Sequence, residues 1–177
     1  MKLLFVAFAL CVLGQTPPGQ TPFAGFEERV NDYMKLRKTA ESGAGRLAPT
    51  ASAKELDAKK KALAEKIRAA RTSAKQGNIF TADAAREFRR VIAQDLQHHP
   101  RSVKQSIRSG EVVEGRVQVN ESYPEHVPLE TTPPTLLTSF PPLPMELDYR
   151  LVGSTLALRD VGANLIIDYL PNALVMP

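Results

Sequence analysis

The stretch that decides the fold is residues 146–170, which read ELDYRLVGSTLALRDVGANLIIDYL. Gly153-Ser154 has the composition of a two-residue β-hairpin loop, in which glycine supplies the positive φ of the first position. The register that this loop predicts is Val152 with Thr155, Leu151 with Leu156, Tyr149 with Leu158 and Asp148 with Arg159. One face of the hairpin is then apolar, and the other carries an opposite-charge pair.

A second turn extends this hairpin into a three-stranded meander. Residues 161–164 form a four-residue loop between two apolar runs. The pairs predicted from that loop are Asp160 with Leu165, Leu158 with Ile167 and Leu156 with Tyr169. Because both loops place apolar residues on the same face, we expect a sheet whose apolar face needs a cover. The helix expected at residues 81–97 is the natural cover.

Upstream of the sheet, apolar residues recur with helical spacing. Ser52 and Glu55 fit a capping box at the start of a basic helix, and Gly77-Asn78 is expected to end it. A short turn then leads into the most amphipathic helix, which favours an antiparallel hairpin of these two helices. The predicted helices are residues 24–40, 52–77, 81–97 and 101–109.

The segment between the helices and the sheet is predicted to be extended. Val113, Val117 and Val119 alternate with polar residues, which is typical of a half-buried strand. Residues 123–144 contain seven prolines and are expected to be irregular or polyproline-like. The fold class expected is α+β, with residues 23–177 forming one domain. Its parts are a helical region at 23–110, an extended segment at 111–144 and the meander at 145–177.

The N-terminus has the features of an export signal. Lys2 precedes an uninterrupted apolar run at residues 3–13, which has the length of a signal-peptide core and is too short to span a bilayer. We expect cleavage near Gly14-Gln15, which would leave a flexible proline-rich start at 15–22 and no membrane span in the mature chain. The alternative is an N-terminal anchor that is never cut. The predicted location is the bacterial periplasm or exterior.

Cysteine usage and net charge further restrict the class of protein. The single cysteine, Cys11, lies inside the apolar run, so the mature protein is expected to contain no disulfide. The net charge of +4 at pH 7 is mildly basic and does not by itself indicate nucleic-acid binding.

Two C-terminal segments carry a resemblance to a known group. The run FPPLPMELDYR begins at Phe140, and LRDVGANLIIDYLP begins at Leu158. Together they resemble the C-terminal signature of a group of uncharacterised exported bacterial proteins. The resemblance implies an exported compartment and an intact C-terminal unit, and it brings no activity with it.

Polar residues gather around the predicted meander. The cluster comprises Arg150, Arg159, Asp160, Asn164 and Asp168. Paired carboxylates could serve acid–base catalysis or bind a cation. The interpretation that we favour is structural, with Asp168 on the outer face of the sheet and Asn164 in a turn that tolerates positive φ.

The basic helix is the other candidate surface. Between residues 52 and 77 there are eight basic and three acidic side chains. The lysines expected to face an anionic partner are Lys59, Lys60, Lys61 and Lys66. That partner would be an anionic envelope component or another protein. Nucleic acid is not expected, because the helix lacks the aromatic residues on which bases stack. A solvated helix face is the plainer alternative.

Motifs for catalysis are missing from the sequence. It contains no nucleophile elbow, phosphate loop, dinucleotide fingerprint or zinc-ligand pattern, and we predict neither a cofactor nor a metal. We therefore expect a non-enzymatic binding or structural protein. Two alternatives stay open. One is a small hydrolase or cation-binding domain that uses the meander cluster, and the other is a helical assembly factor that completes a partner's bundle.

Overall fold

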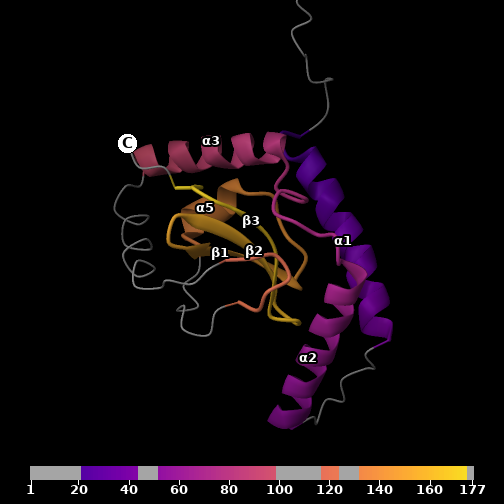
Figure 1. The fold of residues 1–177 in the computed structure, drawn as a ribbon. Coiled ribbons are helices and arrows are strands. Elements are labelled where there is room, and N and C mark those ends of the chain that lie inside the picture. The colour runs from indigo at the N-terminus through magenta and orange to yellow at the C-terminus, as the bar shows by residue number, and fades with distance from the viewer. Residues whose placement is uncertain (1–20, 44–51, 99–116, 124–131, 175–177) are drawn as a thin grey trace, which may run out of the picture.

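The fold is given by a computed structural model that describes residues 21–43, 52–98, 117–123 and 132–174. Helices come first and a three-stranded antiparallel sheet follows, which confirms the predicted α+β class. Figure 1 shows α1 and α2 side by side and α3 running across the sheet. The elements are α1 (Ala24–Ser42), α2 (Ala53–Ala70), α3 (Ala82–His98), α5 (Pro134–Ser139), β1 (Leu147–Val152), β2 (Thr155–Asp160) and β3 (Leu165–Leu170).

The first hairpin of the sheet has the predicted register. Val152 pairs with Thr155, and Asp148 pairs with Arg159. Gly153 has a φ of 56°, a left-handed conformation that glycine adopts without the steric cost of a Cβ. The side chains that this hairpin contributes to the main core are Leu147, Tyr149, Leu151, Leu156 and Leu158.

The register of the second hairpin differs from the prediction by one residue. Asp160 pairs with Leu165 as expected, but the register shifts between Leu158 and Arg159. The pairs beyond the shift are Leu158 with Asp168, Ala157 with Tyr169 and Leu156 with Leu170. The shift is a β-bulge, in which one strand contains an extra residue. The prediction was wrong because alternation of side chains does not report an inserted residue.

The helical hairpin is formed by α1 and α2, whereas the sequence favoured α2 with α3. α1 packs along α2, and Nζ of Lys66 donates to the carbonyl oxygen of Gly43 just beyond α1. α2 ends at Ala70 rather than near residue 77. The next residue, Arg71, has a non-helical backbone conformation, with φ −127° and ψ 37°. The side-chain amide Nδ2 of Asn120 donates to the Arg71 carbonyl oxygen at 2.9 Å. The long turn that follows lets α3 cross the sheet.

The apolar face of the sheet is covered by α1, α3 and α5 together, whereas the prediction named α3 only. Phe88 of α3 is fully buried. Its ring centroid lies 5.0 Å from that of Phe26 on α1, 4.9 Å from Phe140 and 5.9 Å from Tyr149. Such aromatic pairs contribute about 0.5–1.5 kcal/mol each beyond the area that they bury. The main core runs from Phe26 to Leu174.

The segment predicted to be extended contains a helix. α5 begins at Pro134, the first helical position, where proline is tolerated because its missing N–H would have no partner there. Leu136 anchors α5 in the core and is fully buried. The described part of the predicted strand, residues 117–119, is not a strand.

The next residues cover the outer edge of β3 instead. The amide of Asn120 donates to Ile166 O at 2.8 Å, and the amide of Ile166 donates to Glu121 O at 2.9 Å. The amide of Tyr123 donates to Asn164 O at 3.0 Å. These bonds give the β3 edge a backbone partner.

Several predictions concern residues outside the described part of the chain. They are the signal peptide at 1–14, most of the start at 15–22, the helix at 101–109 and the strand residues 113–116. Across the helices that are described, none is long and apolar enough to cross a bilayer.

The capping box that begins α2 is confirmed, and its removal has a local expected effect. The Glu55 amide donates to Ser52 Oγ at 3.3 Å, and the Ser52 amide donates to Glu55 Oε2 at 2.7 Å. Ser52→Ala is expected to lower the free energy of unfolding by about 1 kcal/mol. Hydrogen exchange should become faster over residues 53–62 and stay unchanged in the sheet. Equal acceleration in both regions would contradict a local role.

Candidate functional site

The predicted polar cluster divides into three separate sets of contacts. The first lies on the side of the sheet away from the main core. Nη2 of Arg150 lies 2.6 Å from Asp148 Oδ2, and Nη2 of Arg159 lies 3.1 Å from the same oxygen. The Arg159 guanidinium also lies 5.0 Å from the centroid of the Tyr123 ring. Arg150 and Arg159 therefore come together on one carboxylate.

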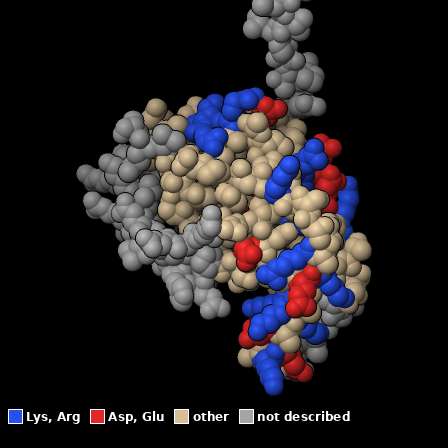
Figure 2. All heavy atoms as spheres, in the orientation of Figure 1, with Lys and Arg blue, Asp and Glu red and all other residues tan. Residues whose placement is uncertain are grey.

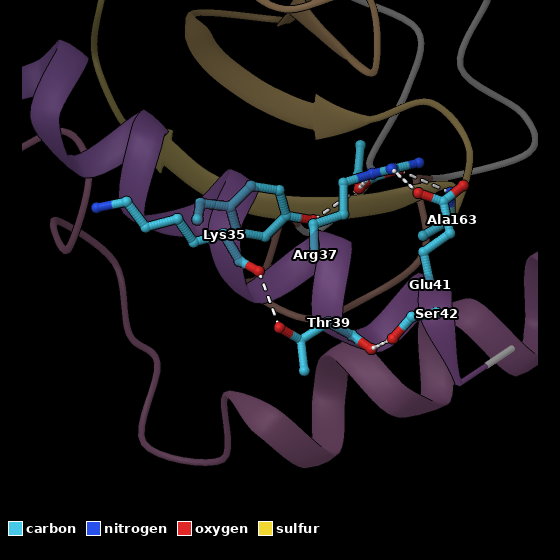
Figure 3. A network of polar contacts seen from close by, with 8 residues as sticks. Lys35, Arg37, Thr39, Glu41, Ser42 and Ala163 are labelled. Atoms are coloured by element: carbon cyan, nitrogen blue, oxygen red, sulfur yellow. Dashed lines mark hydrogen bonds and ion pairs between the residues drawn. The ribbon is translucent and has the colours of Figure 1, made fainter.

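The second set surrounds Asp160, which is fully buried at the end of β2. Tyr33 Oη donates to Asp160 Oδ2 at 2.7 Å, and Arg37 Nε donates to the same oxygen at 2.7 Å. Asp160 Oδ1 accepts from the Ala163 amide at 2.8 Å. Figure 3 shows Arg37 reaching from α1 toward this turn, with Glu41 at its outer side. We call Tyr33, Arg37 and Asp160 the buried ion-pair cluster.

The charges of this cluster are closely matched. Burial lowers the pKa of Arg37, but the Asp160 charge and hydrogen bond outweigh that effect and leave the pKa above its usual value. Burial, followed by the Asp160 charge, raises the pKa of Tyr33. A Cβ at Gly162 would lie 2.8 Å from Arg37 Nη2, so a larger residue there would displace the guanidinium. The cluster is a neutral, closed arrangement that joins α1 to the sheet.

The third set surrounds Asp168, which the bulge places opposite Leu158 on β2. Asp168 was predicted to lie on the outer face, and this is wrong, because it pairs with Leu158, whose side chain belongs to the main core, and its own side chain is fully buried. Its carboxylate accepts from three amides of the α2–α3 turn. These bonds are Gly77 N at 2.9 Å, Ile79 N at 2.6 Å and Phe80 N at 2.8 Å.

Burial raises the pKa of Asp168, and the amide hydrogen bonds from Ile79, Gly77, Phe80 and Tyr169 oppose that rise. The carboxylate acts as an acceptor that holds the turn between α2 and α3 against β3. Bound in this way, both of its oxygens are occupied by the protein's own donors.

Asn164 occupies a turn, as predicted, with a φ of 50°. Its carbonyl accepts from the Tyr123 amide. Asp160 and Asp168 thus have separate partners from different helices and turns. Within the described residues, no group of three or more histidine, cysteine, aspartate or glutamate side chains could hold a metal ion.

The four predicted lysines of α2 do not share one environment. Lys60 and Lys61 are exposed, and Lys59 is half-buried. Lys66 is half-buried and its ammonium binds the Gly43 carbonyl, which favours a structural role at the C-terminal end of α1. Sequence reasoning did not select Lys54, which is exposed on the same helix. At about 100° per residue, Lys54 and Lys61 lie on the same side of α2.

The residues that sequence reasoning missed are Tyr33, Arg37 and Arg71. Arg37 continues the apolar spacing of α1, since Phe26, Val30 and Tyr33 precede it at intervals of four and three. A charged residue at a buried helix position indicates a buried partner, and this signal was available. The partner's identity was not, because Asp160 lies in a distant part of the chain.

Comparison with protein-family models, with curated proteins and with solved structures found no match.

Proposed function

We propose that the chain is exported after cleavage near Gly14-Gln15 and acts as a non-enzymatic binding protein. The partner that we propose is a membrane surface rich in negatively charged phospholipid headgroups. The contact is made by the first half of α2 through Lys54, Lys60 and Lys61. The apolar run at residues 3–13 and the resemblance to exported bacterial proteins support the export step.

The observation that carries the binding proposal is the exposure of the first half of α2. No side chain between residues 53 and 62 is buried, although the helix is regular and capped. Leu56, the large apolar residue of this half, is 39% exposed. Figure 1 shows this end of α2 extending beyond the sheet. Because this half of α2 covers none of the protein's own core, it is accessible to a binding partner.

The charge of the projecting half indicates the kind of partner. Figure 2 shows lysine and arginine side chains along α2 with acidic ones between them. Lys54, Lys60 and Lys61 form no ion pair with any described residue. They are long, flexible and unconfined, so they fit a diffuse negative surface better than a shaped pocket. Each lysine near such a surface contributes about 1 kcal/mol.

In this proposal the two carboxylates of the meander have a structural role. Asp160 and Asp168 accept hydrogen bonds from the protein's own groups. They join the sheet to α1 and to the α2–α3 turn. The exposed lysines, in contrast, are available to a partner.

The test is sedimentation with vesicles made of equal parts phosphatidylglycerol and phosphatidylcholine. The protein used is residues 15–177, since the proposal removes residues 1–14. The triple variant Lys54→Gln, Lys60→Gln, Lys61→Gln is expected to bind at least about tenfold more weakly at low salt. Binding of the unaltered protein should also fall as salt is added, because exposed charges are screened.

The matched control removes three positive charges elsewhere, with Lys38→Gln, Lys75→Gln and Arg86→Gln. All three of these side chains are exposed and lie outside the first half of α2. This variant is expected to bind as the unaltered protein does. An equal loss in both variants would mean that overall charge, and not α2, determines binding. Binding to immobilised heparin without binding to vesicles would replace the lipid with a soluble polyanion and reject the proposal.

A further inference from the structure

A pocket of about 250 Å³ lies between α1 and the long turn that follows α2. One wall is the side chain of Tyr33, and Arg71 lines the pocket beside it, with its guanidinium 5.1 Å from the Tyr33 ring centroid. The volume is below the range of about 300–1,000 Å³ that is typical of sites for drug-sized ligands. A pocket of this volume is suited to a small molecule.

Arg71 is the unusual group in this pocket. Nη2 donates to Ile167 O at 2.8 Å, and Nη1 donates to Asn120 Oδ1 at 3.2 Å. Both acceptors are neutral. No carboxylate among the described residues forms an ion pair with this guanidinium. Two other arginines that the fold buries, Arg37 and Arg159, each have a carboxylate partner.

A half-buried cation without an opposite charge is costly. Burial lowers the pKa of Arg71, and the charges of Tyr33 and Asp168 offset this only in part. The Asp168 carboxylate acts on Arg71 only from a distance, since its two oxygens accept from backbone amides and form no ion pair with this guanidinium. An anion in the pocket would supply the missing charge.

The rest of the lining agrees with an amphipathic anion. Arg29 lies at the rim and is exposed, and it makes no ion pair with a described residue. Asp32, the one acidic residue of the lining, is paired with Lys35 at 2.9 Å. The apolar part of the lining is formed by Leu36, Ala70, Ala74 and Ile79.

We propose that this pocket binds a small carboxylate that carries a short apolar chain. The carboxylate lies between Arg71 and Arg29, and the chain packs against the apolar lining. This site is independent of the lysines of α2, so either proposal can fail alone.

The test measures binding of four probes to residues 15–177 by NMR chemical-shift changes. Hexanoate supplies both the charge and the chain, hexan-1-ol supplies only the chain, and acetate and inorganic phosphate supply only the charge. Hexanoate is expected to bind at least about tenfold more tightly than each of the others, because it alone uses both parts of the pocket. The shift changes should be confined to α1 and residues 70–79.

The obvious variant, Arg71→Gln, also removes the contacts to Asn120 and Ile167 and risks unfolding the region. Two other variants avoid this. Arg29→Gln removes a rim charge and is expected to weaken hexanoate binding several-fold, and Ala74→Leu fills the apolar part and is expected to abolish it. Lys38→Gln, on the same helix but outside the pocket, is the matched control and should not change binding.

Three results would overturn the proposal. Equal binding of hexan-1-ol and hexanoate would leave only an apolar hollow. Equal or tighter binding of phosphate would indicate a simple anion site. Hexanoate binding that survives Ala74→Leu in a folded protein would place the probe elsewhere.

Discussion

Replacing Asp168 with alanine is expected to lower the free energy of unfolding by about 3–5 kcal/mol. Three amides of the turn before α3 lose their charged acceptor, and each such hydrogen bond contributes about 1.5–3 kcal/mol. The amides of Ile79 and Phe80 would stay buried without that partner. The same bonds hold the turn against β3, so α3 should also pack less tightly on the sheet.

Urea denaturation followed by circular dichroism measures this loss. Asp168→Asn keeps the size and one acceptor oxygen, so it should cost less than alanine. The control is Asp57→Ala, an exposed carboxylate on α2, which is expected to change stability by less than about 0.5 kcal/mol. A loss below about 1 kcal/mol for Asp168→Ala would show that the carboxylate does not hold the turn.

The ionisation of Asp168 also makes the stability of the protein depend on pH. Because its pKa is raised in the folded state, the folded protein holds this proton more tightly than the unfolded chain does. Binding of this proton therefore makes its full contribution to stability below the unfolded pKa of about 3.9. It is lost as the pH rises through the folded pKa. The unaltered protein should thus lose stability relative to Asp168→Asn across that rise, and an opposite trend would contradict the raised pKa.

The second large effect is expected in the buried ion-pair cluster. Arg37→Ala leaves the Asp160 carboxylate buried without its cation, and Asp160→Ala leaves the Arg37 guanidinium buried without its anion. Breaking a buried pair by removing one partner costs about 3–5 kcal/mol. The double variant Arg37→Met, Asp160→Leu removes both charges, so it should be more stable than either single alanine variant.

Thermal and urea unfolding of the unaltered protein, Arg37→Ala, Asp160→Ala and the variant that carries both alanines form a double-mutant cycle that measures the coupling. Tyr33→Phe removes one hydrogen bond to Asp160 and should cost about 1 kcal/mol. Glu41→Gln tests the exposed end of the same network, where the Glu41 side chain is 57% exposed, and should cost less than about 0.5 kcal/mol. Additive losses from Arg37→Ala and Asp160→Ala would mean that the two residues are not coupled.

The sheet was predictable wherever local chemistry decides it. The Gly153 turn and the alternation around it predicted the register of β1 with β2, because register in a hairpin follows from its loop. The bulge in β3 was not predictable in this way. It places Asp168 where the amides of Ile79 and Phe80 can reach it, and that advantage depends on a turn from a distant part of the chain.

The helices show the same limit. The capping residues of α2 predicted its start, since Ser52 and Glu55 lie three residues apart and bind each other's backbone amides. Its end was predicted seven residues late, since the Asn120 side chain that binds the Arg71 carbonyl just beyond the helix comes from a distant part of the chain. At the candidate sites, Asp160 was selected from composition, but its partners Tyr33 and Arg37 were missed because they are far away in the sequence.

The backbone of Asn120, Glu121 and Tyr123 along β3 has a consequence for how the chain is made. A bare strand edge invites another molecule to add a strand, and this is a route to aggregation. These residues precede the meander, so they leave the ribosome before β3 does. Arg68, which donates to Asn120 O at 2.8 Å, leaves earlier still. The protective segment is therefore already present when the β3 edge is synthesised. A newly made chain can cover that edge with its own backbone before another molecule pairs with it.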